Sequence, residues 1–205
     1  MSEKISRIIT DFLLRKNVIK EEEKEIYYYG YETLIYGIQQ MILIFVLGMI
    51  RRRIVSTLIF LMVFVSMRKH TGGYHAGSRT GCTVMTILCY LTALVSGEWL
   101  MNMKKGYIIL VFLVLFCVHI FVRYVPVAHP DKTLTKIQRR ESRKKCSLLF
   151  VFYLVISLLL YDVLRIVSYI VLSTMAVTAV LIIIQMRKDA GENEETSVKN
   201  SSNDW

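Results

Sequence analysis

The chain has 205 residues, of which 54% are hydrophobic, and it contains only two prolines. Its apolar residues fall in long uninterrupted runs rather than in the alternating pattern of strands, which indicates membrane-spanning helices. An open sheet cannot satisfy its backbone hydrogen bonds in lipid. The sequence therefore predicts an all-α polytopic integral membrane protein with four to six transmembrane helices.

The net charge of +10 raises the question of a nucleic-acid partner. The cations, however, lie in short segments next to apolar runs, and the chain has no separate soluble domain that could bind a groove of DNA or RNA. Anionic lipid headgroups are the expected partner for such cations, and no nucleic acid is expected.

Residues 1–32 are the first predicted element. Apolar residues recur from Ile5 to Ile19 at helical spacing, and lysines and arginines occupy the other positions of the helical wheel. This pattern predicts one basic amphipathic helix at the membrane interface. Such a helix can serve as an anchor, and it can also offer a docking surface to a second amphipathic helix.

Residues 33–188 form the predicted membrane-embedded domain. Its apolar runs cover about 33–50, 54–67, 82–100, 107–125, 146–164 and 166–186. The second run has 14 residues, and a helix of that length rises only about 21 Å against a hydrocarbon core of about 30 Å. The last two runs, separated only by Asp162 and Arg165, predict either a tight hairpin or one long bent helix. Residues 189–205 are polar and are expected to be a disordered tail.

Charge predicts the orientation. If the N-terminus is cytoplasmic and all six runs cross, 20 of the 26 lysines and arginines lie on the cytoplasmic side. One local exception is the run Arg51, Arg52 and Arg53, which this orientation places on the outer side. The expected location is a plasma membrane, with the N-terminus and the segment around Cys82 in the cytoplasm.

Residues 68–82 form a polar, glycine-rich segment between two apolar runs, and it holds His75 and Cys82. A thiol and an imidazole are sufficient for nucleophilic acyl transfer, because the thiolate attacks a carbonyl and the imidazole moves the protons. Its four glycines predict a loop. Cys82 then opens the next apolar helix, where the helix dipole favours a thiolate.

Two groups in this segment can stabilise the charge that develops on the substrate. The backbone N–H groups near Gly81 and Cys82 are candidate oxyanion donors, and Arg68 is a candidate for orienting the substrate or stabilising that charge. The sequence therefore predicts a cysteine peptidase with Cys82 as nucleophile and His75 as general base.

Other interpretations of the same residues remain open. Cys82 can be a packed small hydrophobe, and the protein a transporter or channel whose glycine-rich loop lines a path. His70, His75 and Cys82 could also hold a metal, but their spacing lacks the glutamate of the H-E-x-x-H motif. The cysteines show no zinc or disulfide spacing, so no metal and no cofactor is expected.

Residues 126–145 are the second polar segment, predicted to be a basic cytoplasmic loop. Such a loop acts as a topology signal and lipid contact, or it receives an acidic peptide segment. The residues expected to bind such a segment are Lys132, Lys136, Arg139 and Arg140.

The segment from Arg68 through Gly73 and His75 to Cys82 resembles the accessory gene regulator B (AgrB) family of bacterial quorum-sensing systems. Residues 124–132 resemble the family's second motif, and the resemblance covers about residues 1–190. It implies a membrane cysteine endopeptidase that cuts the C-terminal acidic tail from an AgrD-like propeptide.

In that resemblance Cys82 matches the nucleophile and His75 the base, and Arg68 and Gly73 match positions needed for activity. A cysteine or serine of the peptide would then attack the Cys82 thioester and close a thiolactone or lactone ring. The family is also associated with homodimers.

Overall fold

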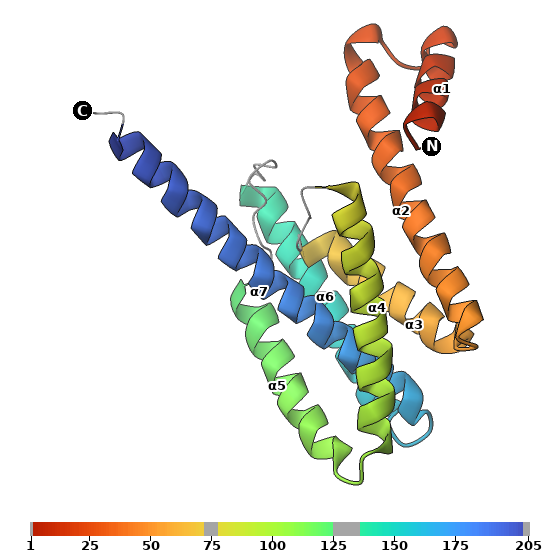
Figure 1. Cartoon of the computed structure of the whole chain (residues 1–205), viewed down its shortest axis with the longest axis vertical. Helices are drawn as coiled ribbons and strands as arrows, with labels where there is room; N and C mark the ends of the chain where they lie inside the picture. Colours follow the sequence, from red (N-terminus) through yellow and green to blue (C-terminus); the bar gives the residue numbers. More distant parts are fainter. Residues whose placement is uncertain (1, 72–77, 125–135, 203–205) are drawn as a thin grey trace. The chain divides into compact units, whose positions relative to one another are not determined.

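The computed structural model describes residues 2–71, 78–124 and 136–202, and every regular element in these ranges is a helix (Figure 1). Five helical segments are long and apolar enough to cross a membrane: Glu21–Ile50, Ile54–Thr71, Arg79–Asn102, Gly106–Tyr124 and Arg165–Lys188. The prediction of an all-α polytopic membrane protein is confirmed. The helices group into two compact units, residues 1–52 and residues 53–205.

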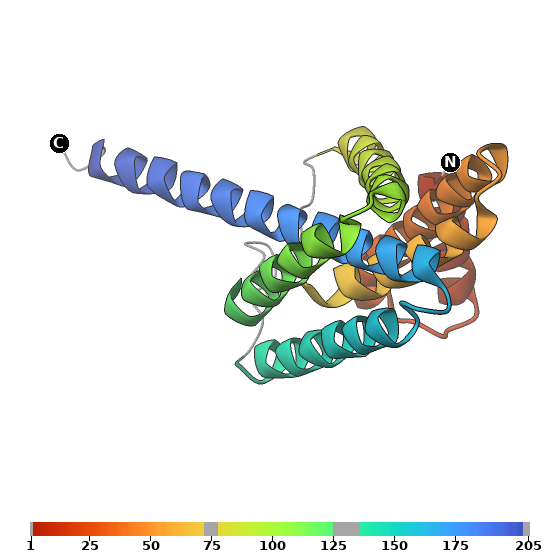
Figure 2. The same ribbon diagram turned by 90° about the horizontal axis from the view of Figure 1, so that it is seen from below.

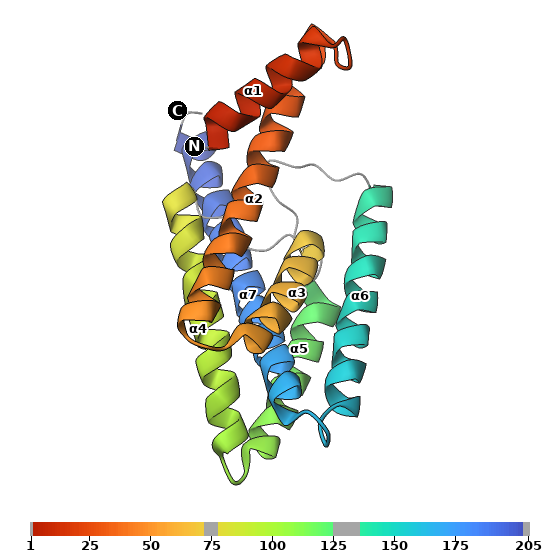
Figure 3. The same cartoon turned by 90° about the vertical axis from the view of Figure 1, so that its right-hand side faces the viewer.

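The first unit contains α1 (Ser2–Arg15), the 3₁₀ turn η1 (Glu21–Glu23) and α2 (Lys24–Ile50). Figure 3 shows α1 lying against the first part of α2. The Lys24 Nζ lies 3.3 Å from Asp11 Oδ1, and the Arg7 guanidinium carbon lies 5.7 Å from the centre of the Tyr28 ring. Polar side chains therefore join the two helices.

The predicted N-terminal amphipathic helix is present as α1, but it is shorter than residues 1–32, because it ends at Arg15. Asn17 takes the left-handed conformation with φ of 53°. Its N–H donates to Leu14 O and the Val18 N–H donates to Leu13 O. These two bonds form a Schellman motif, in which asparagine is one of the few residues that tolerates positive φ.

The polar side of α1 faces α2, and its apolar side is exposed. Ser6 and Thr10 are buried, whereas Ile8 is 68% exposed and Phe12 57% exposed. A helix that lies at the surface of a bilayer presents such an apolar face to lipid. The amphipathic pattern of the sequence therefore describes a face of α1 that α2 leaves uncovered.

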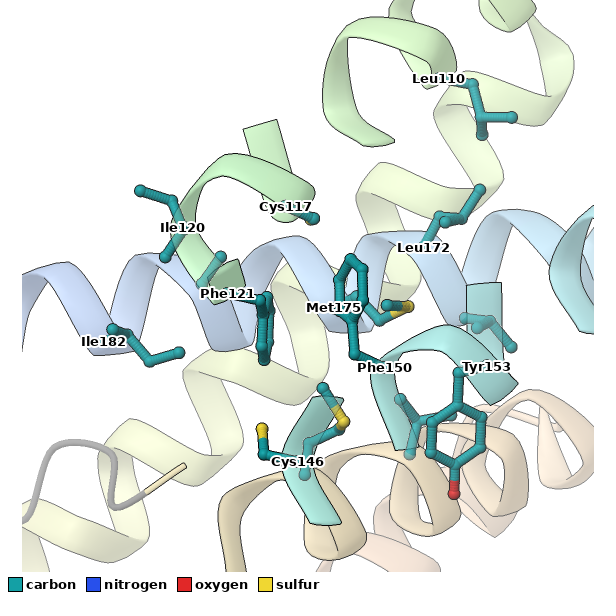
Figure 4. Packing of buried hydrophobic residues seen from close by; sticks show 14 of the residues in the cluster. Leu110, Cys117, Ile120, Phe121, Cys146, Phe150, Tyr153, Leu172, Met175 and Ile182 are labelled. Atoms are coloured by element: carbon teal, nitrogen blue, oxygen red, sulfur yellow. The ribbon is translucent and has the colours of Figure 1, made fainter. Parts of the chain in front are cut away.

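The second unit consists of α3 (Ile54–Thr71), α4 (Arg79–Asn102), α5 (Gly106–Tyr124), α6 (Lys136–Leu159) and α7 (Arg165–Ser202). In the apolar 18-residue window of α7, 67% is buried, against 39% in the corresponding windows of α3 and α4. α7 also packs against all four other helices of this unit (Figure 2). Figure 4 shows part of this core, where the Phe121 and Phe150 rings lie 4.8 Å apart close to Met175. α7 is therefore the central helix.

The second apolar run gives a longer helix than its 14 apolar residues suggested. α3 has 18 residues and a length of about 27 Å, because it continues through Arg68, Lys69 and His70 to Thr71. These polar residues are compatible with a last helical turn, where cations interact favourably with the helix dipole. The predicted catalytic loop 68–82 is correspondingly shorter, since its ends belong to α3 and α4.

Two further expectations need correction. The predicted basic loop 126–145 is helical from Lys136 onward, because lysine, arginine, glutamine and glutamate are all good helix formers. The predicted disordered tail is helical to Ser202, since no proline interrupts it and extending an existing helix requires no new nucleation. Of the two arrangements predicted for the last two apolar runs, the structure has the hairpin, because α6 ends at Leu159, α7 begins at Arg165 and the two helices pack against each other (Figure 3).

Candidate functional site

Cys82 is the fourth residue of α4, as its position at the start of an apolar run predicted. Ser78 precedes the helix with extended φ and ψ of −134° and 151°, and its Oγ accepts a hydrogen bond from the Gly81 N–H at 3.1 Å. This arrangement is a helix N-cap, which typically contributes about 1 kcal/mol to the helix terminus. Ser78 therefore fixes the backbone turn from which the Cys82 side chain projects.

Arg68 lies next to the thiol. Its Nη2 is 3.6 Å from the Cys82 sulfur, so the last turn of α3 and the first turn of α4 bring a guanidinium and a sulfur into contact across 14 residues of chain. Both residues are partly buried. A cation at this distance stabilises a thiolate and any negative charge that develops on atoms bound to the sulfur.

The backbone N–H groups expected to receive an oxyanion already have partners. The Gly81 N–H donates to Ser78 Oγ, and the Cys82 N–H donates to Ser78 O at 3.0 Å as the first bond of the helix ladder. In this structure both groups are therefore engaged at the helix terminus, and the role of backbone N–H groups near Gly81 and Cys82 as oxyanion donors stays a prediction. Among the described contacts at Cys82, the donor that points at the sulfur is the side chain of Arg68.

An aromatic ring that the sequence analysis did not identify lies beside Arg68. The guanidinium carbon is 5.5 Å from the centre of the Phe64 ring, within the range of a cation–π contact. Phe64 precedes Arg68 by four residues on α3, so the two side chains share one helix face. This i, i+4 spacing is the signal that could have revealed the contact from the sequence.

Cys82 also differs from the three other cysteines in its exposure. Cys89, Cys117 and Cys146 are buried, whereas Cys82 is partly exposed, and all four are free thiols. A nucleophile must be accessible to its substrate, and a packed structural cysteine need not be. Exposure and charge environment therefore both select Cys82 from the four.

Basic residues gather at the Cys82 end of the second unit. α3 and α5 end there and α4 and α6 begin there (Figure 3). The helical backbone from Lys136 places Arg139 and Arg140 one turn further along the same face. Arg143 also lies in this segment, and its Nη2 donates to Val122 O of α5 at 3.1 Å. The start of α6 is thus rich in basic residues, and Arg143 connects it to α5.

Several predicted site residues lie outside the described part of the chain. These are Gly73, His75 and Lys132. The pairing of His75 with Cys82 and the metal hypothesis, which requires His75, therefore both stay predictions.

Comparison with known proteins shows the family of this chain. Residues 6–186 match the family model described as accessory gene regulator B. An AgrB-like protein of Clostridium perfringens strain SM101 is 28% identical over 169 residues, which cover 78% of this chain and 79% of the relative. AgrB-like protein 2 of Clostridium perfringens strain 13 is 27% identical over the same lengths. No solved structure matches the chain. The family match spans most of the sequence, including Arg68 and Cys82, and the chain belongs to the accessory gene regulator B family.

Proposed function

We propose that this protein is a cysteine endopeptidase of the plasma membrane that cuts the C-terminal tail from an AgrD-like propeptide. Membership of the AgrB family supports a role in the agr quorum-sensing system. The observation that carries the finer proposal is the contact of 3.6 Å between Arg68 Nη2 and the partly exposed Cys82 sulfur.

In the proposed first step the Cys82 thiolate attacks the carbonyl carbon of the scissile peptide bond. His75 takes the thiol proton and returns it to the departing amine of the tail, so that the C–N bond breaks and a thioester forms. Arg68 stabilises the sulfur anion before attack and the negative charge on the tetrahedral intermediate.

In the proposed second step a thiol or hydroxyl of the bound peptide attacks the thioester. His75 takes the proton of the attacking group and passes it to the Cys82 sulfur as the C–S bond to Cys82 breaks, and the peptide leaves as a thiolactone or lactone ring. Intramolecular attack is favoured because the two reacting groups have a high effective concentration. Hydrolysis competes only if water enters the site.

The distribution of charge supports a cytoplasmic site. Arg68, Arg79, Arg123 and the basic start of α6 belong to one end of the second unit, whereas fewer cations lie at the opposite helix ends. We infer that this end faces the cytoplasm, where the acidic tail of the propeptide meets Lys132, Lys136, Arg139 and Arg140.

The exposed apolar face of α1 supports two further partners in the proposal, membrane lipids and the leader of the propeptide. The exposed Ile8 and Phe12 of α1 suit insertion among lipid headgroups or contact with the amphipathic leader of the propeptide. Homodimer formation is part of the proposal through the family resemblance alone.

The proposal is tested by expressing the protein together with its candidate propeptide and following the cut peptide by mass spectrometry. Cys82→Ala and His75→Ala should each lower cleavage by at least about 100-fold, because each removes a group that acts in the reaction. Cys89→Ala is the matched control, since Cys89 is a buried cysteine two helical turns away. Cleavage that survives Cys82→Ala would refute the proposal.

A further inference from the structure

Arg68 has a long flexible side chain, and its contact with Cys82 requires one particular conformation. Fixing such a side chain costs conformational entropy. Something in the protein must therefore favour the conformation that reaches the sulfur. One residue that contacts the guanidinium from the same helix is Phe64.

Phe64 is itself held firmly. It is 3% exposed, and its ring stacks on Phe60 with a centroid distance of 4.9 Å and an interplanar angle of 17°. Phe60 in turn forms a T-shaped pair with Tyr90 on α4, with a centroid distance of 5.3 Å. Phe60 and Tyr90 are fully buried. We call Phe64, Phe60 and Tyr90 the aromatic stack.

The stack joins the same two helices that carry Arg68 and Cys82. α3 contributes Phe60, Phe64 and Arg68, and α4 contributes Tyr90 and Cys82. The ring face of Phe64 attracts the guanidinium through the ring quadrupole, and this attraction is stronger where water is excluded. The rigid ring therefore presents a surface that the guanidinium can cover while its Nη2 reaches the sulfur.

We propose that Phe64 is a positioning residue, which holds the Arg68 guanidinium against the Cys82 sulfur by a cation–π contact from the aromatic stack. This inference rests on the proposed function of Cys82 and adds a residue that acts on the reaction through Arg68. If Phe64 has this role, the position of the Arg68 positive charge beside the sulfur depends on the Phe64 ring.

The test measures the charge beside the sulfur without requiring the propeptide. Full-length protein in opened membranes is treated with iodoacetate or with iodoacetamide, and modification of Cys82 is followed by peptide mass. Both reagents react with the thiolate, but only iodoacetate is an anion, so the ratio of the two rates reports a nearby cation. A change in the amount of folded protein alters both rates and leaves their ratio unchanged.

Phe64→Leu should lower the iodoacetate-to-iodoacetamide ratio by about three- to tenfold, because it removes the aromatic face. Phe64→Tyr keeps that face and should retain a ratio close to that of the wild type. Phe150→Leu is the matched control, since Phe150 is a buried, paired phenylalanine of the same unit whose described ring partner is Phe121. This control should leave the ratio unchanged.

The decisive comparison is a double-mutant cycle with Arg68→Gln. If Phe64 acts through Arg68, then Phe64→Leu has no further effect on the ratio once Arg68 is replaced. A ratio that does not change in Phe64→Leu, that falls equally in Phe64→Tyr, or that falls again in the double variant would overturn the inference. Failure of the peptidase proposal gives a different result, namely cleavage that survives Cys82→Ala.

Discussion

Thr57 and Tyr90 join α3 to α4 through hydroxyl groups 2.8 Å apart, and both residues are fully buried. The Thr57 hydroxyl donates its proton to Arg53 O at 2.8 Å. The Tyr90 hydroxyl must therefore be the donor in the bond between the two side chains. This pair anchors the aromatic stack at the end remote from Arg68.

The direction of this hydrogen bond predicts unequal effects on stability. Thr57→Val leaves the buried Tyr90 hydroxyl without its acceptor and should cost about 1–3 kcal/mol. Tyr90→Phe leaves Thr57 bonded to Arg53 O and should cost less, about 0.5–1 kcal/mol. Unfolding of the purified protein by denaturing detergent measures both values. A larger loss in Tyr90→Phe than in Thr57→Val would contradict the assignment of the donor.

Replacement of Arg68 separates its charge from its geometry. Arg68→Gln should lower the rate of propeptide cleavage by about 100-fold, comparable to the loss of an oxyanion donor. Arg68→Lys keeps the positive charge but loses the planar guanidinium, so we expect a smaller loss of about tenfold. Initial rates of cleavage provide the measurement, with Lys69→Gln as control because Lys69 is the next residue and is exposed. Equal rates for Arg68→Gln and wild type would remove Arg68 from the mechanism.

The basic start of α6 predicts recognition of the acidic tail. Exchanging Lys136, Arg139 and Arg140 together for glutamate should weaken processing by at least about tenfold, because like charges then repel the tail. The control exchanges Lys104 and Lys105, which lie between α4 and α5 at the other end of the unit. Cleavage is measured at several propeptide concentrations, and the loss should decrease as concentration rises. Unaltered cleavage in the triple variant would exclude this face from binding.

Replacing Gly106 should destabilise the turn between α4 and α5. A Cβ added at this position would collide with the backbone carbonyl of Leu100, which cannot move aside as a flexible side chain can. Gly106→Ala should therefore cost about 1–3 kcal/mol of stability. Gly37→Ala is the matched comparison, because nothing lies within 4 Å of its added Cβ, and alanine is the better helix former. A Gly106→Ala protein as stable as the Gly37→Ala protein would contradict this packing.

The sequence predicted the features that depend on hydrophobic runs. The helical class and the start of α4 just before Cys82 both follow from where apolar residues begin and end. The end of α1 was not predicted, since it depends on the positive φ of Asn17. The charged residues at the end of α3 and the start of α6 predict loops, but such residues are compatible with a helix and the helical backbone includes them.

At the candidate site the residue types were predictable and the contacts were not. Arg68 stood out as a cation near Cys82 in the sequence, but its distance to the sulfur depends on how α3 and α4 pack. The capping role of Ser78, which engages the Gly81 N–H, follows from local geometry that the glycine-rich composition obscured. The contact of Phe64 with Arg68 was not predicted, because Phe64 is one of many apolar residues in α3 and an aromatic ring there is ordinarily a core residue.

The most direct test of the central claim is the mass of the Cys82 peptide isolated from protein that has been mixed with its propeptide and quenched rapidly in acid. The account predicts an adduct on Cys82 with the mass of the N-terminal propeptide fragment, joined by a thioester that hydroxylamine cleaves. The adduct should be absent when the mixture lacks propeptide. Propeptide cleavage at the wild-type rate by Cys82→Ala, with no adduct in the wild-type protein, would contradict the account.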